Sequence, residues 1–321
     1  MSEGGATAGD RVDPDIRRFV EAVIAAYAAH ATEGRASLDA RRAVAERVRQ
    51  PWREGGPAMA ATIETALDGL RLRVHRPTEA SALSAMLYIH GGGWTLFSID
   101  THDRLMREYA ARAGIVVVGL DYRLAPEQPF PAALDDCLAA LAWMREQAAS
   151  LGIDPGRLLV GGDSAGANLA VALCLALRDR GAALPAGMLL NYGAFSPEHL
   201  PSYERYGGPG FMLEPGEMDQ FWHDYAGDPA RLADPYVVPL LADLHGLPSA
   251  FLAIAECDIL ADSNHAFAAR LGEAGVPVQS VTYRGATHSF LEAVSISSLA
   301  NRALAEQALW IRRTLGLGDE A

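Results

Sequence analysis

Apolar residues in this chain cluster in short continuous runs, and longer segments with helical spacing separate one run from the next. Continuous apolar runs are typical of parallel strands that helices cover on both faces, so the alternation predicts an α/β fold. Residues 70–74 are the exception: Leu-Arg-Leu-Arg-Val alternates, which predicts an antiparallel edge strand with one face in water. The expected strands cover residues 70–74, 85–89, 115–120, 158–161, 188–192, 251–255 and 278–283.

The pentapeptide Gly162-Asp-Ser-Ala-Gly166 stands between one of these strands and a helical stretch at residues 167–177. A serine hydroxyl is a poor nucleophile unless a sharp turn holds it clear of the backbone, and glycine on both sides permits such a turn. The helix that follows directs free N–H groups toward developing negative charge. The G-x-S-x-G string is weak alone, but with these flanks it predicts a nucleophile elbow that carries Ser164.

A glycine-rich loop, His90-Gly-Gly-Gly-Trp94, ends another apolar strand. Such a loop is either a flexible turn or a source of unpaired backbone N–H groups for an oxyanion. The elbow elsewhere in the chain favours the second interpretation. We therefore expect an oxyanion hole formed by the N–H groups of Gly91, Gly92 and Ala165, and a structural role for His90.

An elbow serine needs an acid and a histidine, and in this kind of fold they follow it in that order, each in a loop after a strand. His288 follows the strand at 278–283, and Asp258 follows the strand at 251–255. Of the nine histidines in the chain, only His288 has this placement. Asp262 is the alternative acid, although it better suits the first turn of a helix.

From about residue 72 to its end the chain resembles the bacterial hormone-sensitive-lipase family of α/β-hydrolases. The resemblance implies the α/β-hydrolase fold and hydrolysis of carboxylic esters by Ser164, His288 and Asp258, with no metal and no cofactor. Besides the HGGG and GDSAG motifs, it rests on the segments Asp121-Tyr-Arg-Leu-Ala-Pro-Glu127, Pro129-Phe-Pro131, Asp234-Pro235, Leu247-Pro248, Asp258-Ile-Leu and Ala274-Gly-Val276.

One position departs from the family pattern. The family usually follows its histidine with Gly-Phe, whereas this chain has Ser289-Phe290. We expect a small change in the backbone or in the water near the base, and no loss of activity.

Three segments lie outside the expected sheet. Residues 15–31 and 38–48 have the pattern of amphipathic helices, and residues 195–227 form a long insertion. We expect them to cap the site. The predicted organisation is an N-terminal cap at residues 1–55 and a catalytic domain at 56–321, with its cap insertion at about 195–227.

The insertion and the HGGG loop are rich in aromatic side chains. Such a cluster is more often plain packing than a pocket, but its location here favours a mixed role. Glycines at 207, 208 and 210 should leave the insertion mobile. The hypothesis is that Trp94, Phe211 and Met212 wall the substrate pocket.

Composition and charge narrow the class of partner. A chain of 321 residues that is half hydrophobic can bury one large core, and a net charge of −13 argues against nucleic acid and anionic membrane surfaces. The start of the chain has no cationic or apolar signal pattern, which predicts a cytoplasmic protein. The expected partner is a small-molecule ester, and a homodimer stays open. Cys137, Cys174 and Cys257 are too scattered for a disulfide framework and predict buried thiols.

Two alternatives to an esterase remain at this point. The same scaffold carries amide and N-acetyl hydrolases of the arylformamidase kind, since specificity lies in the pocket. Related plant hormone receptors bind a ligand without catalysis and lack the histidine, which is present here as His288.

Overall fold

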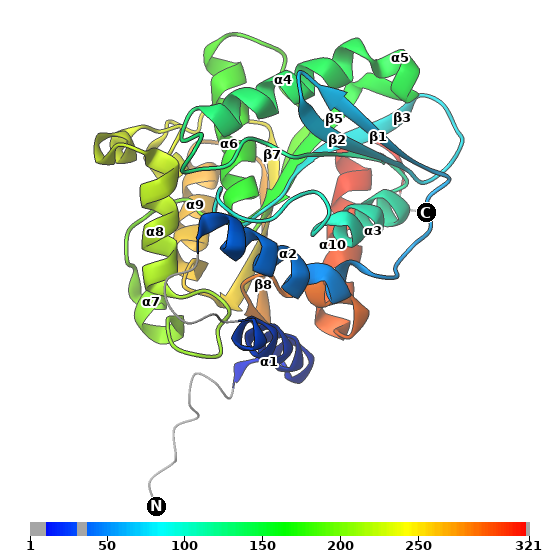
Figure 1. The fold of residues 1–321 in the computed structure, drawn as a ribbon. Helices are drawn as coiled ribbons and strands as arrows, with labels where there is room; N and C mark the ends of the chain where they lie inside the picture. Colours follow the sequence, from blue (N-terminus) through cyan, green and yellow to red (C-terminus); the bar gives the residue numbers. More distant parts are fainter. Residues whose placement is uncertain (1–10, 31–36, 319–321) are drawn as a thin grey trace, which may run out of the picture.

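The computed structural model describes residues 11–30 and 37–318, whose strands form one sheet in the order β1-β2-β4-β3-β5-β6-β7-β8 (Figure 1). β2 pairs with β1 and β4 in the antiparallel sense, and all other neighbours are parallel. This confirms the mostly parallel sheet. The strands are β1 (Ala61–Leu67), β2 (Leu70–Arg76), β3 (Leu83–Ile89), β4 (Val116–Leu120), β5 (Ile153–Asp163), β6 (Gly187–Asn191), β7 (Ser249–Cys257) and β8 (Val278–Thr287).

Helices cover both faces of the sheet, with α3 and α10 packed together on one face and α4 and α6 on the other (Figure 1). α6 begins directly after the Ser164 turn, and its residues 165–177 are all buried. The helices are α1 (Pro14–Ala29), α2 (Leu38–Arg53), α3 (Asp103–Ala113), α4 (Ala132–Glu146), α5 (Ala148–Leu151), α6 (Ala165–Asp179), α7 (Pro201–Tyr206), α8 (Pro215–Ala226), α9 (Ala261–Glu273) and α10 (Ser298–Thr314), with short 3₁₀ turns η2 (Pro229–Ala233), η3 (Pro239–Leu241) and η4 (Phe290–Ser295).

The edge strand on the β1 side differs from the prediction. The alternating residues 70–74 lie in β2, which is antiparallel as predicted but has β1 and β4 on its two sides. β1 itself is the edge. The sequence pattern missed it because β1 buries none of its seven residues fully, so it carries no apolar run.

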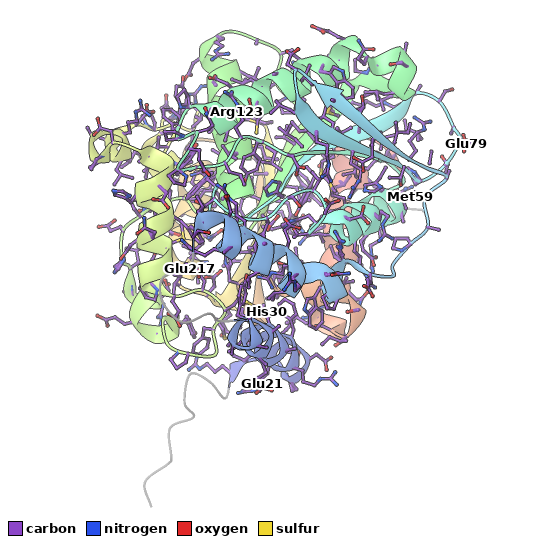
Figure 2. The ribbon with its side chains drawn as sticks, viewed as in Figure 1. Glu21, His30, Met59, Glu79, Arg123 and Glu217 are labelled. Atoms are coloured by element: carbon purple, nitrogen blue, oxygen red, sulfur yellow. The ribbon has the colours of Figure 1, made fainter. Side chains whose placement is uncertain are left out.

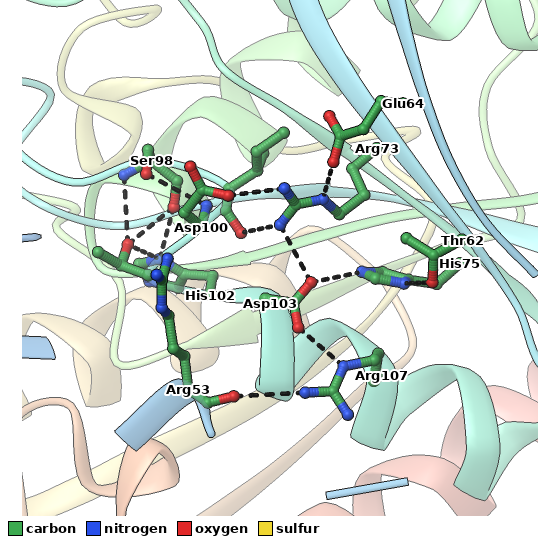
Figure 3. Close-up of polar contacts among 12 residues, drawn as sticks. Arg53, Thr62, Glu64, Arg73, His75, Ser98, Asp100, His102, Asp103 and Arg107 are labelled. Carbon is green, nitrogen blue, oxygen red and sulfur yellow. Dashed lines mark hydrogen bonds and ion pairs between the residues drawn. The ribbon is translucent and has the colours of Figure 1, made fainter. Parts of the chain in front are cut away.

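An ion-pair network joins β1 and β2 to α3 (Figure 3). The guanidinium of Arg73 pairs with Glu64, with Asp100 at 2.6 Å and with Asp103 at 3.0 Å. Burial would raise the pKa of Asp103, but hydrogen bonds from His75 and Arg107 lower it. The network holds the start of α3, which carries His102 at its N-cap, against the antiparallel strands.

The two N-terminal helices form where the amphipathic pattern predicted them. The side chain of Asp13 caps α1 by accepting from the amides of Asp15 and Ile16, and Ser37 caps α2 in the same way. Both helices pack against η4, the turn that follows β8 (Figure 1). The division into a 1–55 cap and a 56–321 catalytic domain stays a prediction, and residue 31 of the first helix lies outside the described residues.

The three cysteines are buried and free, as predicted. Within residues 11–30 and 37–318, no helix combines the length and the apolar character that a bilayer span requires.

Candidate active site

Ser164 occupies a strained turn between β5 and α6. Its backbone has φ 54° and ψ −117°, outside the regions that L-residues prefer, and its amide donates to the carbonyl of Asn191 at 2.9 Å. The flanking glycines are required by space. A Cβ at Gly162 would lie 2.3 Å from the carbonyl oxygen of Ile89, and one at Gly166 would lie 1.9 Å from the same atom. The turn is therefore built as the nucleophile elbow predicts.

His288 stands between Ser164 and Asp258. Its Nε2 is 3.0 Å from the Ser164 Oγ, and its Nδ1 is 2.7 Å from Asp258 Oδ2. All three side chains are buried, and Asp258 also accepts from the amide of Leu260 at 3.0 Å. A neutral imidazole with its proton on Nδ1 donates to Asp258 and accepts from the serine hydroxyl, which is the arrangement of a nucleophile, base and orienting carboxylate.

The alternative acid is engaged elsewhere. Asp262 accepts from the amide of Ser202 at 2.8 Å and pairs with Arg205 at 2.7 Å, at the start of α9. Since the carboxylate at His288 is Asp258, the geometry favours Asp258 over Asp262 as the third member of the site.

The oxyanion loop corrects one part of the prediction. The amide of Gly91 donates to Asp163 Oδ1 at 3.2 Å and is therefore not free for a substrate. In the described part of the chain, the amides of Gly92, Gly93 and Ala165 have no hydrogen-bond partner, and Gly92 and Gly93 line the cavity at Ser164. The candidate donors thus become Gly92, Gly93 and Ala165, one residue further along the loop.

Asp163 connects the elbow to the oxyanion loop, a role that sequence reasoning missed. Besides the Gly91 amide, its carboxylate accepts from the Tyr88 hydroxyl at 2.7 Å and lies 3.3 Å from His102 Nε2. Burial opposes the charge of both groups, but their attraction prevails: the pKa of Asp163 is lowered and that of His102 is raised. The signal in the sequence was the carboxylate inside the G-D-S-A-G motif itself.

His90 is structural, as expected. Its ring stacks on Tyr122 with centroids 4.3 Å apart, and its Nδ1 lies 2.7 Å from the carbonyl oxygen of Gly91. Burial and the neighbouring His102 lower the pKa of His90 to about 3, so it stays neutral. A neutral, stacked ring fixes the start of the oxyanion loop.

A cavity of about 220 Å³ opens onto Ser164 and His288. Its walls come from the loops at the carboxyl ends of the parallel strands, from both N-terminal helices and from the insertion. The other lining residues are Tyr27, Arg49, Gly92, Gly93, Leu96, Phe97, Asp163, Met212, Leu213, Glu214, Glu217, Met218, Phe221 and Ser289.

Of the predicted pocket residues, Met212 lines this cavity and Trp94 and Phe211 do not. Trp94 is fully buried and stacks on Tyr225 with centroids 4.3 Å apart. Phe211 packs edge-on against Tyr206. Trp94 packs the HGGG loop against the insertion and Phe211 packs within the insertion, so the aromatic residues that line the cavity are Tyr27, Phe97 and Phe221.

The backbone at Ser289 has a conformation that suits glycine. Its φ is +60°, in the left-handed region where a side chain costs about 1 kcal/mol or more. Glycine removes this strain but adds freedom to the unfolded chain, which offsets about 0.5–1 kcal/mol. Ser289→Gly is therefore expected to keep activity and to change the free energy of unfolding by less than about 1 kcal/mol, measured by denaturant titration. A loss of several kcal/mol would show that the Ser289 hydroxyl supports the His288 loop.

Comparisons with known proteins agree with this geometry. Residues 86–292 fit a family described as having the α/β-hydrolase fold. An ethyl acetate hydrolase of Pseudomonas putida is 41% identical over 248 residues, covering 75% of this chain and 78% of that protein. The carboxylesterase NlhH of Mycobacterium tuberculosis is 37% identical over 250 residues, covering 74% and 76%. The crystal structure of an esterase from Pyrobaculum calidifontis has a TM-score of 0.87 at 32% identity, covering 96% of this chain and all of that one.

The chain therefore belongs to the α/β-hydrolase family, and the predicted fold is confirmed. Within that family its relatives are carboxylesterases and ester hydrolases, and the chain is a serine hydrolase of this esterase group.

Proposed function

We propose that this protein hydrolyses carboxylic esters with short to medium acyl chains through Ser164, His288 and Asp258. The observation that carries the proposal is the hydrogen-bonded line from Asp258 through His288 to the Ser164 hydroxyl at the wall of the cavity. The esterase relatives support the same reaction.

The proposed reaction has two halves. His288 Nε2 takes the proton of Ser164 as its Oγ bonds to the ester carbonyl carbon, and the amides of Gly92, Gly93 and Ala165 receive the negative charge on the carbonyl oxygen. His288 then gives the proton to the departing alkoxide, which leaves an acyl group on Ser164. A water molecule then attacks the acyl carbon while His288 takes its proton. His288 returns the proton to Ser164 Oγ as the bond from Ser164 to the acyl group breaks, and the acid is released. Asp258 holds the imidazole and stabilises its cation throughout.

The acyl-chain range follows from the cavity. A space of about 220 Å³ walled by Leu96, Phe97, Met212 and Phe221 accepts a short apolar chain and gives a long one no room without movement of the cap. We expect kcat/KM to be highest for short esters and to fall toward palmitate.

The test is hydrolysis of p-nitrophenyl esters from acetate to palmitate, combined with labelling by a p-nitrophenyl alkylphosphonate. Rapid turnover of short esters and a phosphonate adduct on Ser164, located by mass spectrometry, are the expected results. Turnover without modification of Ser164 would overturn the mechanism. If no ester is hydrolysed, the amide hydrolase and the ligand-binding protein take precedence.

The pH profile tests the role of His288. Burial lowers the pKa of this imidazole, but the adjacent charge and hydrogen bond of Asp258 outweigh burial and raise it above its ordinary value of 6.5. The base must be neutral, so kcat/KM should be full above this pKa and fall about tenfold per pH unit below it. We expect the midpoint of the acid limb above pH 6.5. A flat profile from pH 5 to 8 would contradict the assignment.

A further inference from the structure

Arg49 is a buried cation in the wall of the catalytic cavity. It lies in the last turns of α2, its residue is 4% exposed, and it lines the same space as Ser164 and His288. Leu96, Phe97, Met212 and Met218 make much of the cavity wall apolar, so a buried guanidinium there requires an explanation.

The hydrogen bonds of Arg49 within the protein are incomplete. Its Nε forms an ion pair with Glu292 Oε2 at 3.4 Å, and its Nη2 makes a weak contact with the Met212 sulfur at 3.9 Å. Neither Nε nor Nη1 has a hydrogen-bond partner among the described residues, and neither has Glu292 Oε2. The rings of Phe97 and Phe19 lie 5.1 and 5.8 Å from the guanidinium carbon, which supports the charge but uses no N–H group.

A guanidinium has five N–H donors, and a buried donor without an acceptor is costly. Substrate binding can supply the acceptor that the protein does not: Nη2 has only its weak contact with the Met212 sulfur, and Nε and Nη1, which are covered, become available when the side chain shifts. We propose that Arg49 is a specificity-determining residue that donates a hydrogen bond to an oxygen of the substrate outside the reacting ester group. The substrate class is then a short ester whose acyl or alcohol part carries an additional neutral oxygen, as an ether, ketone or second ester. This inference rests on the proposed ester hydrolysis.

The charges around the cavity favour a neutral oxygen over a carboxylate. Glu292 already balances the charge of Arg49. Glu214 and Glu217 line the same cavity, and Glu217 lies on the side of α8 that faces α2 (Figure 2). A substrate carboxylate would therefore meet one cation and several carboxylates, whereas a neutral acceptor gains the hydrogen bond without that repulsion.

The test uses pairs of esters that differ by one oxygen. p-Nitrophenyl methoxyacetate and p-nitrophenyl butyrate have acyl chains of equal length, as 2-methoxyethyl butyrate and n-butyl butyrate have alcohol chains of equal length. The ratio of kcat/KM within each pair is measured for the wild type and for Arg49→Met. Comparing the ratios between the two enzymes cancels the intrinsic reactivity of the esters. We expect the ratio for one pair to fall about tenfold or more in the variant, as for a hydrogen bond from a charged donor.

Loss of Arg49 leaves Glu292 buried without its partner, so the single variant can be unstable. The double variant Arg49→Met with Glu292→Gln removes both charges and should show the same change of ratio. Thermal unfolding checks both variants. If neither variant folds, the test uses the wild type alone, with each ratio of kcat/KM divided by the ratio of the rates of hydroxide-catalysed hydrolysis for the same two esters. A preference for the oxygen-containing ester in either pair then supports the proposal. The absence of a preference in both pairs overturns it.

The remaining outcomes separate this inference from the proposed function. Equal losses on all esters, or unchanged ratios in both pairs, would overturn the specificity role while ester hydrolysis stands. If hydrolysis of p-nitrophenyl hemisuccinate depends on Arg49 and is faster than that of the methoxy ester, the group that Arg49 binds is a carboxylate, and the proposal of a neutral acceptor is overturned. If Ser164→Ala hydrolyses the esters as fast as the wild type does, the proposed function is overturned, and the proposal for Arg49, which rests on it, is overturned with it.

Discussion

Alanine at position 164 is expected to lower kcat/KM for p-nitrophenyl butyrate by a factor on the order of 10⁵. The variant keeps the cavity, the candidate oxyanion amides and the His288–Asp258 pair, but no oxygen remains to attack the ester carbonyl. The residual rate comes from water activated by His288 and from the amides of Gly92, Gly93 and Ala165. The burst of p-nitrophenol release measures acylation, which should disappear in the variant. The steady-state release measures the residual rate of hydrolysis.

A matched serine separates chemistry from folding. Ser196 is buried, but its hydroxyl accepts from the amide of Glu198 and does not line the cavity. Ser196→Ala should keep kcat/KM within a small factor of the wild type. Thermal unfolding of the two variants should be similar. A Ser164→Ala enzyme with more than a few per cent of wild-type activity would place the nucleophile elsewhere.

The sheet and the Ser164–His288–Asp258 arrangement follow from local features of the sequence. β3, β4 and β6 are continuous apolar runs because both of their faces are buried, and this pattern is visible without a structure. Parallel strands also end at one edge, so the residues that follow β7 and β8 had to come together there. Among the acids of residues 11–30 and 37–318, Asp258 is the one that lies within hydrogen-bond distance of the His288 ring.

The direction of individual amides could not be predicted in the same way. The HGGG loop offers several N–H groups, and which of them point to the cavity depends on φ values of +108° at Gly92 and +58° at Gly93. It also depends on Asp163, a residue 72 positions away that takes the Gly91 amide. The pocket wall is set by similarly distant contacts, since α2 brings Arg49 to the cavity while Trp94 is turned into the core.

Replacing Asp258 by asparagine is expected to lower kcat/KM by about 10⁴ while the geometry persists. The carboxylate at 2.7 Å requires the His288 proton on Nδ1, which leaves Nε2 free to accept from Ser164. An amide can instead donate to Nδ1, and the proton then moves to Nε2, where it blocks the base. The charge that raises the pKa of His288 is also lost, so the residual activity should have its acid limb at lower pH than the wild type.

Asp262→Asn is the matched control, because Asp262 follows Asp258 in the same segment and is the only other acid that the sequence left open. Its partner Arg205 is half-exposed, so breaking that pair should cost at most about 1 kcal/mol of stability and leave the pH profile unchanged. The contrast between the two variants assigns the orienting role. If both lose activity equally, or if Asp258→Asn loses less than tenfold, His288 is held by something other than the Asp258 carboxylate, and the mechanism proposed for Ser164 would need another source of its base.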